Sequence, residues 1–371
     1  MILRLLLTLT FIPGFLHAID AIDAPKAQEK SPLADSPQRL RGLIDTLNQA
    51  SLQEAFRLLT TDYINQEKLD PLEVNRAALQ GMLNRLDFGA MLLTDQELSE
   101  RNSPHQFYNT HVTEETAYIR FGKFNRSGVT ELDQALKEYS KDKLLVNLIV
   151  DLRSPQAQAD FAIASEILSR FRPPSELLFK IRRPGNDRPT LFVSQPVQNG
   201  WNRNLILLVD SETGNVGEII AAVLKRETGC LIIGEATPGL TVEYRDVPIG
   251  DDRVLRYAIA EVVLEDESSI FQVGINPDII TPTAASSKHS IFESTETGTP
   301  LTQFLFQKQR PRMNEAALVA GTDPEIDYYL LRSNGKATPW DDAPLQDRVL
   351  QQAVDLLNAS QFLESGSKKS R

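Results

Sequence analysis

The stretch from residue 205 to residue 240 has the layout in which hydrolases hold a nucleophile. An apolar run, LILLVD, leads into a polar turn, and the helical segment GEIIAAVLK is followed by a second apolar run, CLIIG. A strand that turns tightly into a helix presents one side chain and leaves backbone N–H groups free to hold an oxyanion. The chemistry of this turn therefore depends on which residue stands where the helix begins.

That residue is Asn215, which precedes Glu218 in the pattern N-x-x-E. A carboxamide has no proton to give up near neutral pH, so Asn215 cannot serve as an activated oxygen nucleophile. The pattern is instead a variant of the capping box, in which the Asn oxygen accepts from helix N–H groups and Glu218 reaches back. We expect Asn215 to cap the helix, an interaction worth about 1 kcal/mol.

Ser211 is the alternative nucleophile on the same turn. Its neighbours Asp210 and Glu212 are both acids, which disfavour an alkoxide, and the sequence favours a turn residue at this position. Lys225 lies about two helical turns beyond Glu218, too far from the start of the helix to act as a base there. An active site rebuilt around Ser211 therefore lacks a base in register.

The residue pattern gives no support to metal or cofactor chemistry. His105, His111 and His289 fall in segments that read as polar loops, with no carboxylate or cysteine at ligand spacing. The single cysteine, Cys230, lies in an apolar run, where a thiol is inert and packs as a small hydrophobic group. We predict no metal site and no bound cofactor.

The elements that must position this turn form an α/β pattern. From about residue 116, short apolar runs alternate with amphipathic helical stretches, which indicates strands buried on both faces. Leucines at helical spacing over 40–47 and 79–86 predict a small helical N-terminal region. Turn signals at PGND and GDD predict β-hairpins over 176–194 and 242–264.

The last predicted element is an amphipathic helix close to the C-terminus. Its sequence, LQDRVLQQAVDLLNASQFL, repeats apolar residues at helical spacing. One stripe of this helix carries Leu345, Val349, Ala353 and Leu356.

Composition and charge limit the classes of partner that the protein can bind. The 371 residues are 41% hydrophobic with a net charge of -11, which fits one large or two ordinary globular domains. No basic stripe is present to release counterions, so we predict no nucleic-acid partner.

The first residues indicate export. Residues 1–21 combine one Arg, an apolar core and small residues at Ala18 and Ala21, as in a signal peptide. The apolar run is short and is interrupted by Pro13 and Gly14, so we expect no membrane span in the mature chain, although an uncleaved anchor stays open. We predict a periplasmic or secreted protein.

The order of the pieces resembles the C-terminal processing, or tail-specific, serine peptidase family, over about residues 75–360. Members have a crotonase-like ββα core, usually carry a PDZ domain, and cleave exported proteins with a serine and a lysine. The resemblance therefore implies an α/β fold with a crotonase-like ββα core, a small helical N-terminal region and a C-terminal amphipathic helix. The pieces that carry it are AALQGMLNRLD, LLTDQELSE, TAYIRFGKF, LIVDLR, GEIIAAVLK, IIGEATPG and YRDVPIGDDRVLRYAIAEVVL with FQVGINPDIITP.

The resemblance places different residues at the family's working positions. Asn215 stands where the family has its serine, and Leu240, directly after GEATPG, stands where it has the lysine. Tyr244 corresponds to a glutamine that assists the lysine. Leucine accepts no proton, and losing a nucleophile or its base costs about a million-fold in rate in a well-studied protease. We expect no hydrolysis at this site.

The turn after LIVDLR also departs from the family. Members have an Asn- and Gly-rich segment there, which helps to form the oxyanion hole, and the PDZ insertion is missing because only about twenty residues separate LLTDQELSE from YIRF. Proline removes an N–H and side chains crowd the turn. The predicted cleft and oxyanion turn consist of Ser154, Pro155, Gln156, Val216 and Gly217.

Three functions remain open from the sequence. The first is an inactive relative of the peptidases that binds a polypeptide or a protein partner, and an active relative is one candidate partner. The second is an active serine endopeptidase with a rebuilt site, and the third is a structural scaffold. The expected organisation is a signal peptide over 1–21, a linker over 22–37, a helical region over 38–100, a tail-specific-protease-like core over 113–300, an extension and helix over 301–362 and a disordered tail over 363–371.

Overall fold

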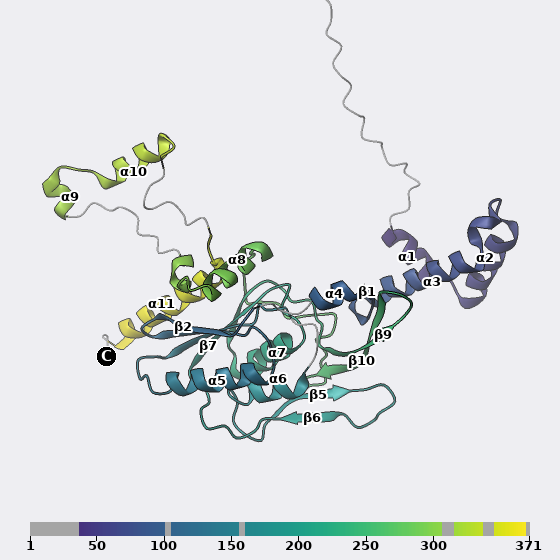
Figure 1. Ribbon diagram of the computed structural model, residues 1–371, viewed down its shortest axis with the longest axis horizontal. Helices are drawn as coiled ribbons and strands as arrows, with labels where there is room; N and C mark the ends of the chain where they lie inside the picture. The colour runs from purple at the N-terminus through teal and green to yellow at the C-terminus, as the bar shows by residue number, and fades with distance from the viewer. Residues whose placement is uncertain (1–36, 101–104, 156–159, 306–314, 337–344, 369–371) are drawn as a thin grey trace, which may run out of the picture. The chain divides into compact units, whose positions relative to one another are not determined.

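The computed structural model describes residues 37–100, 105–155, 160–305, 315–336 and 345–368 (Figure 1). The expected signal peptide and all of the expected linker except residue 37 lie outside these residues. Within the described residues, no helix is long and apolar enough to span a bilayer. The chain divides into two compact units, residues 1–79 and 80–371.

The first unit is helical where it is described. Asn48 begins the longest helix that lies wholly in this unit, because its side-chain oxygen accepts from the N–H of Ser51 at 2.9 Å. This helix has no buried residue, and apolar side chains such as Phe56 and Leu59 are exposed. The elements are α1 (Pro37–Asp45), α2 (Gln49–Asp62), η1 (Gln66–Leu69) and the start of α3 (Pro71–Leu86).

The second unit is built on a six-stranded sheet with the order β11-β8-β7-β4-β3-β2. All neighbouring strands are parallel except β2, which runs antiparallel to β3. Every residue of β3 and β4 is buried, as expected for continuous apolar runs covered on both faces. The strands are β2 (Tyr108–Thr113), β3 (Thr116–Arg120), β4 (Asn147–Asp151), β7 (Asn204–Val209), β8 (Leu231–Gly234) and β11 (Ile279–Ile280).

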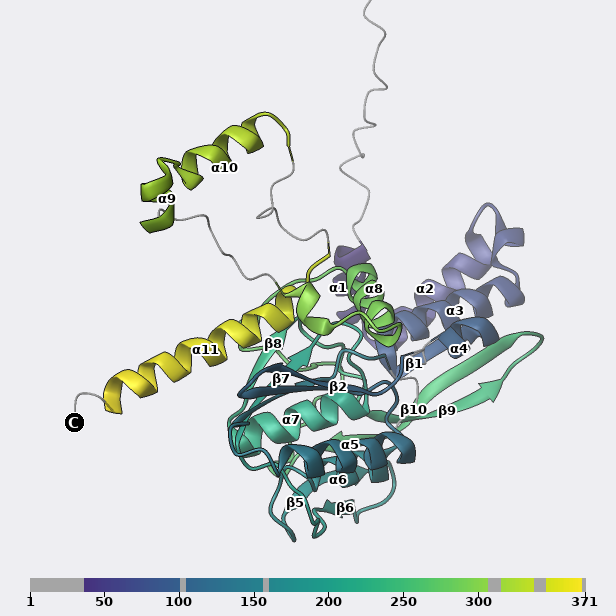
Figure 2. The ribbon, with the colours of Figure 1, turned by 60° about the vertical axis from the view of Figure 1, so that its left-hand side comes forward.

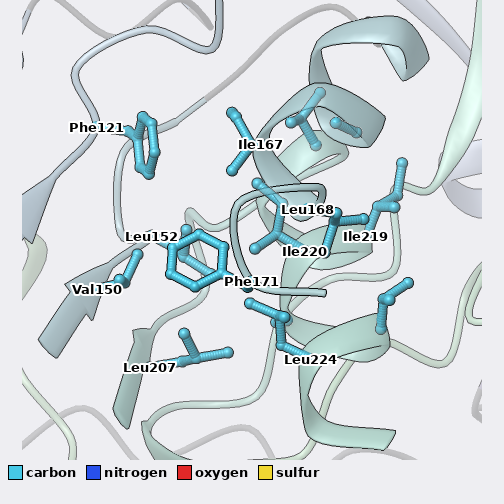
Figure 3. Packing of buried hydrophobic residues seen from close by; sticks show 14 of the residues in the cluster. Phe121, Val150, Leu152, Ile167, Leu168, Phe171, Leu207, Ile219, Ile220 and Leu224 are labelled. Carbon is cyan, nitrogen blue, oxygen red and sulfur yellow. The ribbon is translucent and has the colours of Figure 1, made fainter. Parts of the chain in front are cut away.

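Helices cover both faces of this sheet (Figure 2). One face packs against α5, α6 and α7 through side chains such as Val150, Leu207 and Ile220, part of the close-packed core in Figure 3. The other face packs against α8, η3 and α11. These helices are α5 (Arg126–Tyr139), α6 (Phe161–Leu168), α7 (Val216–Thr228), α8 (Ala285–Glu296), η3 (Leu301–Phe304) and α11 (Arg348–Lys368).

The predicted terminal helix is present as α11. Val349 and Ala353 of the predicted stripe are buried, and Leu356 packs partly buried beside them, whereas Leu345 precedes the helix, which begins at Arg348. The helix continues to Lys368 and so extends into the expected tail over 363–371.

The second sheet is antiparallel and contains both predicted hairpins. β5 pairs with β6, and the long strand β10 pairs with β9, β1 and β5. The strands are β1 (Ala90–Thr94), β5 (Leu177–Arg182), β6 (Thr190–Val193), β9 (Val242–Pro248) and β10 (Arg253–Val263). The remaining elements are η2 (Asp87–Gly89), α4 (Asp95–Glu100), α9 (Glu315–Ala320) and α10 (Pro324–Ser333). The predicted α/β class is confirmed.

Candidate functional site

The carboxyl ends of three parallel strands place the candidate site at one edge of the six-stranded sheet. β4 leads into the turn with Ser154, β7 into the turn that ends at Asn215, and β8 into the segment that ends at Leu240. Ligand sites of parallel α/β sheets lie at this edge, where loops from neighbouring strands meet. The sequence segments expected to form the site are therefore brought together.

Asn215 holds a strained backbone conformation. Its φ is 43° and its ψ is -105°, and the residue is 1% exposed. A non-glycine residue in this region costs about 1–3 kcal/mol and persists only where the surroundings impose it. The tight strand-to-helix turn of hydrolases strains its nucleophile position in the same way. The turn has the backbone shape of a nucleophile elbow, with a carboxamide at its tip.

The side chains of Asn215 and Glu218 form the predicted capping box, with unequal halves. The Asn215 N–H donates to Glu218 Oε2 at 3.1 Å. The Asn215 Oδ1 faces the helix N–H groups but makes no well-formed hydrogen bond with the described residues. Its Nδ2 donates to the carbonyl of Val242 at 2.9 Å. Asn215 therefore ties the turn to the first residue of β9 as well as to its own helix.

Glu218 fixes the segment after β8 against this turn. Its carboxylate also accepts from Thr237 Oγ1 at 2.6 Å, from the Gly239 N–H at 2.5 Å and from the Leu240 N–H at 2.6 Å. Burial raises the pKa of Glu218, and these hydrogen bonds oppose the rise by favouring the ionised form. One carboxylate therefore fixes the positions of Asn215 and Leu240 relative to each other.

The cavity in front of the turn is small, at about 150 Å³. Pockets that bury a drug-sized ligand have roughly 300–1,000 Å³. No lysine or histidine of the described chain lines this cavity. The lining residues are Met91, Pro155, Ser211, Glu212, Gly214, Asn215, Pro238, Leu240, Tyr244 and Arg256.

Tyr244 lines the cavity, but its hydroxyl points elsewhere. The hydroxyl donates to the carbonyl of Phe88 at 2.8 Å, and the ring lies under the guanidinium of Arg256, 5.3 Å from its centroid. Arg256 in turn pairs with Asp246 at 2.7 Å. Tyr244 therefore anchors β9 to the segment that precedes β1, and its hydroxyl is directed away from a role beside Leu240.

The expected oxyanion turn is filled by protein groups. Ser154 is buried, and its hydroxyl donates to the carbonyl of Phe121. Pro155 forms an antiparallel bridge with Thr213 and lines the cavity, where it offers no N–H. Val216 opens α7 and is buried, and the Gly217 N–H donates to the carbonyl of Gly214 at 3.0 Å. Gln156 lies outside the described residues.

Ser211 is exposed at the mouth of the cavity, and within the part of the chain that the structure describes its hydroxyl has no hydrogen bond to a basic group. Lys225, two turns down α7, pairs with Asp278 at 2.8 Å and donates to the carbonyl of Asn276. The separation expected from the sequence is therefore present. Ser211 has the solvent-facing position of a turn residue.

Sequence reasoning missed a buried lysine behind the turn. Lys288 of α8 is 1% exposed and donates to the Arg153 carbonyl at 2.8 Å, to Asp210 Oδ2 at 2.6 Å and to Glu212 Oε2 at 2.5 Å. Burial raises the pKa of Asp210, and Lys288 opposes that rise. Burial also acts to raise the pKa of Glu212, but Lys288 and His289 outweigh it and leave the pKa lowered. All three hydrogen bonds of the amine go to carbonyl or carboxylate oxygens, so it neutralises two acids instead of activating a hydroxyl.

Two histidines that the sequence placed in separate loops meet beside this lysine. His105 Nε2 lies 2.9 Å from His289 Nδ1, and His289, on α8, lies 2.9 Å from Glu212 through its Nε2. His111 lies apart on β2, 4.0 Å from Asp142. The expectation of scattered loop histidines is wrong for this pair, because residues 184 positions apart gave no local signal.

The hydrogen-bond distances link the donor and acceptor roles of the two histidines. If His289 donates from Nε2 to Glu212, its Nδ1 must accept, so His105 donates from Nε2. His105 Nδ1 lies 3.3 Å from Glu296 Oε1. Burial lowers the pKa of His105; Glu296 opposes this, while Arg120 and His289 lower the pKa further.

The described residues show no cluster of three or more histidine, cysteine or acidic side chains that could hold a metal ion. Cys230 is buried at the start of the β8 run, and burial raises its pKa to about 11, which keeps the thiol protonated.

Residues 115–281 match peptidase family S41. This part of the chain is similar to the C-terminal processing, or tail-specific, peptidases.

Curated proteins similar to this chain are carboxyl-terminal-processing proteases. The chain is 26% identical over 174 residues to a carboxyl-terminal-processing protease of Picosynechococcus sp., covering 46% of this chain and 40% of the relative. It is 24% identical over 260 residues to the carboxyl-terminal-processing protease of Synechocystis sp., covering 67% of this chain and 57% of the relative. The chain thus spans about two fifths to three fifths of the length of these relatives.

Solved structures with similar folds include a photosystem II D1 C-terminal processing protease, at a TM-score of 0.40, 21% identity and 48% coverage of each chain. Another is a putative peptidase from Parabacteroides merdae, at a TM-score of 0.47 and 14% identity, covering 66% of this chain and 85% of the other.

Proposed function

We propose that this S41 domain is an inactive relative of the peptidases, which binds a polypeptide or a protein partner without cleaving it. The observation that carries the proposal is the pair of side chains on the elbow cavity, Asn215 and Leu240. Neither can take up or release a proton near neutral pH, whereas a serine peptidase needs a nucleophile with a base in reach. The bridge between Pro155 and Thr213 further supports the proposal, because it occupies the turn expected to hold an oxyanion.

The alternative function is an active serine endopeptidase whose active site is rebuilt around Ser211. It requires a base within hydrogen-bond distance of the hydroxyl. Lys288, the buried amine behind the same turn, already donates to three oxygens, from Arg153, Asp210 and Glu212. These three hydrogen bonds account for all the N–H groups of the amine, and none of them goes to a hydroxyl. No observation favours this alternative over binding, or favours a scaffold that has no ligand.

Labelling with a fluorophosphonate tests the loss of the nucleophile. We expect no adduct on the wild-type protein and no cleavage of an unfolded protein substrate. The matched control is the double variant Asn215→Ser and Leu240→Lys, which puts a hydroxyl and an amine at the two positions fixed by Glu218. A stoichiometric adduct on any serine of the wild-type protein would overturn the proposal, whereas an adduct on the double variant alone would support the assigned register.

We also propose that the protein is exported. The proposal rests on residues 1–21, which combine an arginine, an apolar core and small residues at its end. Fusing these residues to alkaline phosphatase, which is active only where its disulfides form, should give an active reporter in a bacterial host. Replacing the apolar core with serines should abolish that activity, and an equally active serine version would contradict export.

A further inference from the structure

The long strand β10 has an interruption along one edge. On this edge Arg253–Tyr257 pair with β1, and Glu261–Val263 pair with β5. Neither ladder includes Ala258, Ile259 or Ala260 on this edge, although β9 continues along the other edge. β1 and β5 both run antiparallel to β10, so the sheet contains a gap where one strand ends and another begins.

A groove of about 800 Å³ lies along this gap. The unpaired stretch of β10 forms part of its lining, and Ala258 and Ala260 contribute only methyl groups there. The hairpin loop 183–189 forms another part, with Phe271 and Val242 among the remaining residues. The groove therefore lies beside the stretch of β10 that neither β1 nor β5 pairs, and the side chains of this stretch at Ala258 and Ala260 are small.

The charges beside the groove are largely satisfied by one another. Arg182 pairs with Glu261 at 2.6 Å, and Arg183, just after β5, pairs across β10 with Glu243 of β9. Lys180 pairs with Glu267. A groove whose side-chain charges are paired offers no strong field for a charged small molecule. Its distinctive feature is the strand edge, which recognises main-chain N–H and C=O groups.

We propose that this groove binds a short extended peptide segment, which pairs with residues 258–260 of β10 and fills the gap between β1 and β5. The proposal rests on the proposed binding function and gives it a location. Three strand residues span roughly 10 Å, so the paired part of the ligand is short and its flanking residues leave the sheet, as those of β1 and β5 do.

Volume separates this groove from the elbow cavity. The cavity of about 150 Å³ at Asn215 is below the size of ordinary ligand pockets, whereas the groove of about 800 Å³ is within it. The bulge in β10 between Ala258 and Ala260 is a further sign, because bulges occur where a strand's pairing is altered beside functional sites. Recognition through main chain makes the site tolerant of the ligand's sequence.

Fluorescence titration of the full-length protein tests the proposal, with a labelled short peptide of alternating valine and threonine as the probe. Ala258→Arg fills the groove and should weaken binding at least tenfold. Ala359→Arg, an exposed position on α11, is the matched control and should leave the affinity unchanged. A version of the peptide N-methylated at alternate residues should also bind at least tenfold more weakly to the wild-type protein, because it cannot donate main-chain hydrogen bonds.

The outcomes separate the groove from the proposed function. Slower amide exchange of residues 258–260 in the presence of the peptide would support the groove directly. If the wild-type protein binds the peptide but neither Ala258→Arg nor N-methylation weakens it, the groove is wrong and the binding function stands. If the wild-type protein does not bind the peptide, the groove is contradicted, whereas binding of a protein partner and the fluorophosphonate result are unaffected. The N-methylated peptide still tests main-chain pairing if Ala258→Arg fails to fold, because it is measured on the wild-type protein.

Discussion

The two sides of the turn that ends at Asn215 differ in how their polar groups are arranged. On the cavity side, Asn215 and Leu240 carry no titratable group, and the charged lining residues Glu212 and Arg256 are paired with Lys288 and Asp246. Behind the turn, Lys288 also neutralises Asp210. The backbone strain and the Glu218 contacts keep the shape of a catalytic elbow. The difference teaches that the titratable groups nearest the elbow are used to hold the fold together and are not placed to transfer a proton at the cavity.

Removing the buried amine of Lys288 should have the largest effect and tests this comparison most directly. Lys288→Met leaves Asp210 and Glu212 without their counter-ion, and removing one partner of a buried ion pair costs about 3–5 kcal/mol. We therefore expect the free energy of unfolding in urea to fall by about that amount. The measurement is urea unfolding at neutral pH.

Lys225→Met is the matched control. Lys225 pairs with Asp278 at 2.8 Å, but its side chain is 37% exposed, and such pairs contribute about 0–1 kcal/mol. Equal losses for the two variants would show that Lys288 is no more important to stability than a surface lysine, and the contrast between the two sides of the turn would lose its energetic basis.

The histidine pair gives a smaller and pH-dependent effect. The pKa of His105 is lowered in the folded protein, so below its ordinary value near 6.5 the unfolded chain binds a proton that the folded chain does not. The contribution of His105 to the free energy of unfolding is therefore fully present above pH 6.5. It is lost as the pH falls toward the pKa of His105 in the folded protein, by at most about 1.4 kcal/mol per pH unit. The groups facing it are Glu296, Arg120 and His289, with Glu212 beyond His289.

His105→Gln removes this titration while keeping an amide donor near His289. Urea unfolding from pH 8 to pH 5 should show a shallower acid loss for this variant than for the wild-type protein. His111→Gln, at an exposed position on β2, is the control and should keep the wild-type slope. If the stability of His105→Gln fell with pH as steeply as that of the wild-type protein, the acid sensitivity would come from groups other than His105.

The sequence predicted what local patterns encode. The apolar runs predicted β4 and β7, turn residues predicted both hairpins, and N-x-x-E predicted the Glu218 contact to the Asn215 N–H. These features depend on residues close in sequence, where periodicity and capping act directly.

The features that the sequence did not predict depend on tertiary packing. Lys288 meets Asp210 only because α8 packs against the sheet, and His105 meets His289 across 184 residues. The gap beside Ala258 depends on where β1 and β5 end along β10, which is a matter of register between distant strands. The three further bonds of Glu218 required the loop after β8 to be in place.

The smallest predicted effect tests whether the elbow is strained. At an ordinary helical position glycine is less stable than alanine by roughly 0.5–1 kcal/mol. Asn215 has a φ of 43°, a region that alanine enters only with strain and glycine enters freely. Both substitutions lose the bond to the Val242 carbonyl, so that loss cancels between them. Asn215→Gly should therefore be more stable than Asn215→Ala by about 1 kcal/mol, the reverse of the helical order.

The control compares the wild-type protein with the variant Ala359→Gly. Ala359 is an exposed position on the helix α11, where glycine should be less stable than alanine. Urea unfolding of the four proteins measures both differences. If Asn215→Ala were as stable as Asn215→Gly, the turn would be relaxed, and its shape would owe nothing to the strain that accompanies a nucleophile elbow. An inverted order would show that the surroundings, chiefly the Glu218 contacts, impose that shape on a residue that cannot itself act as the nucleophile.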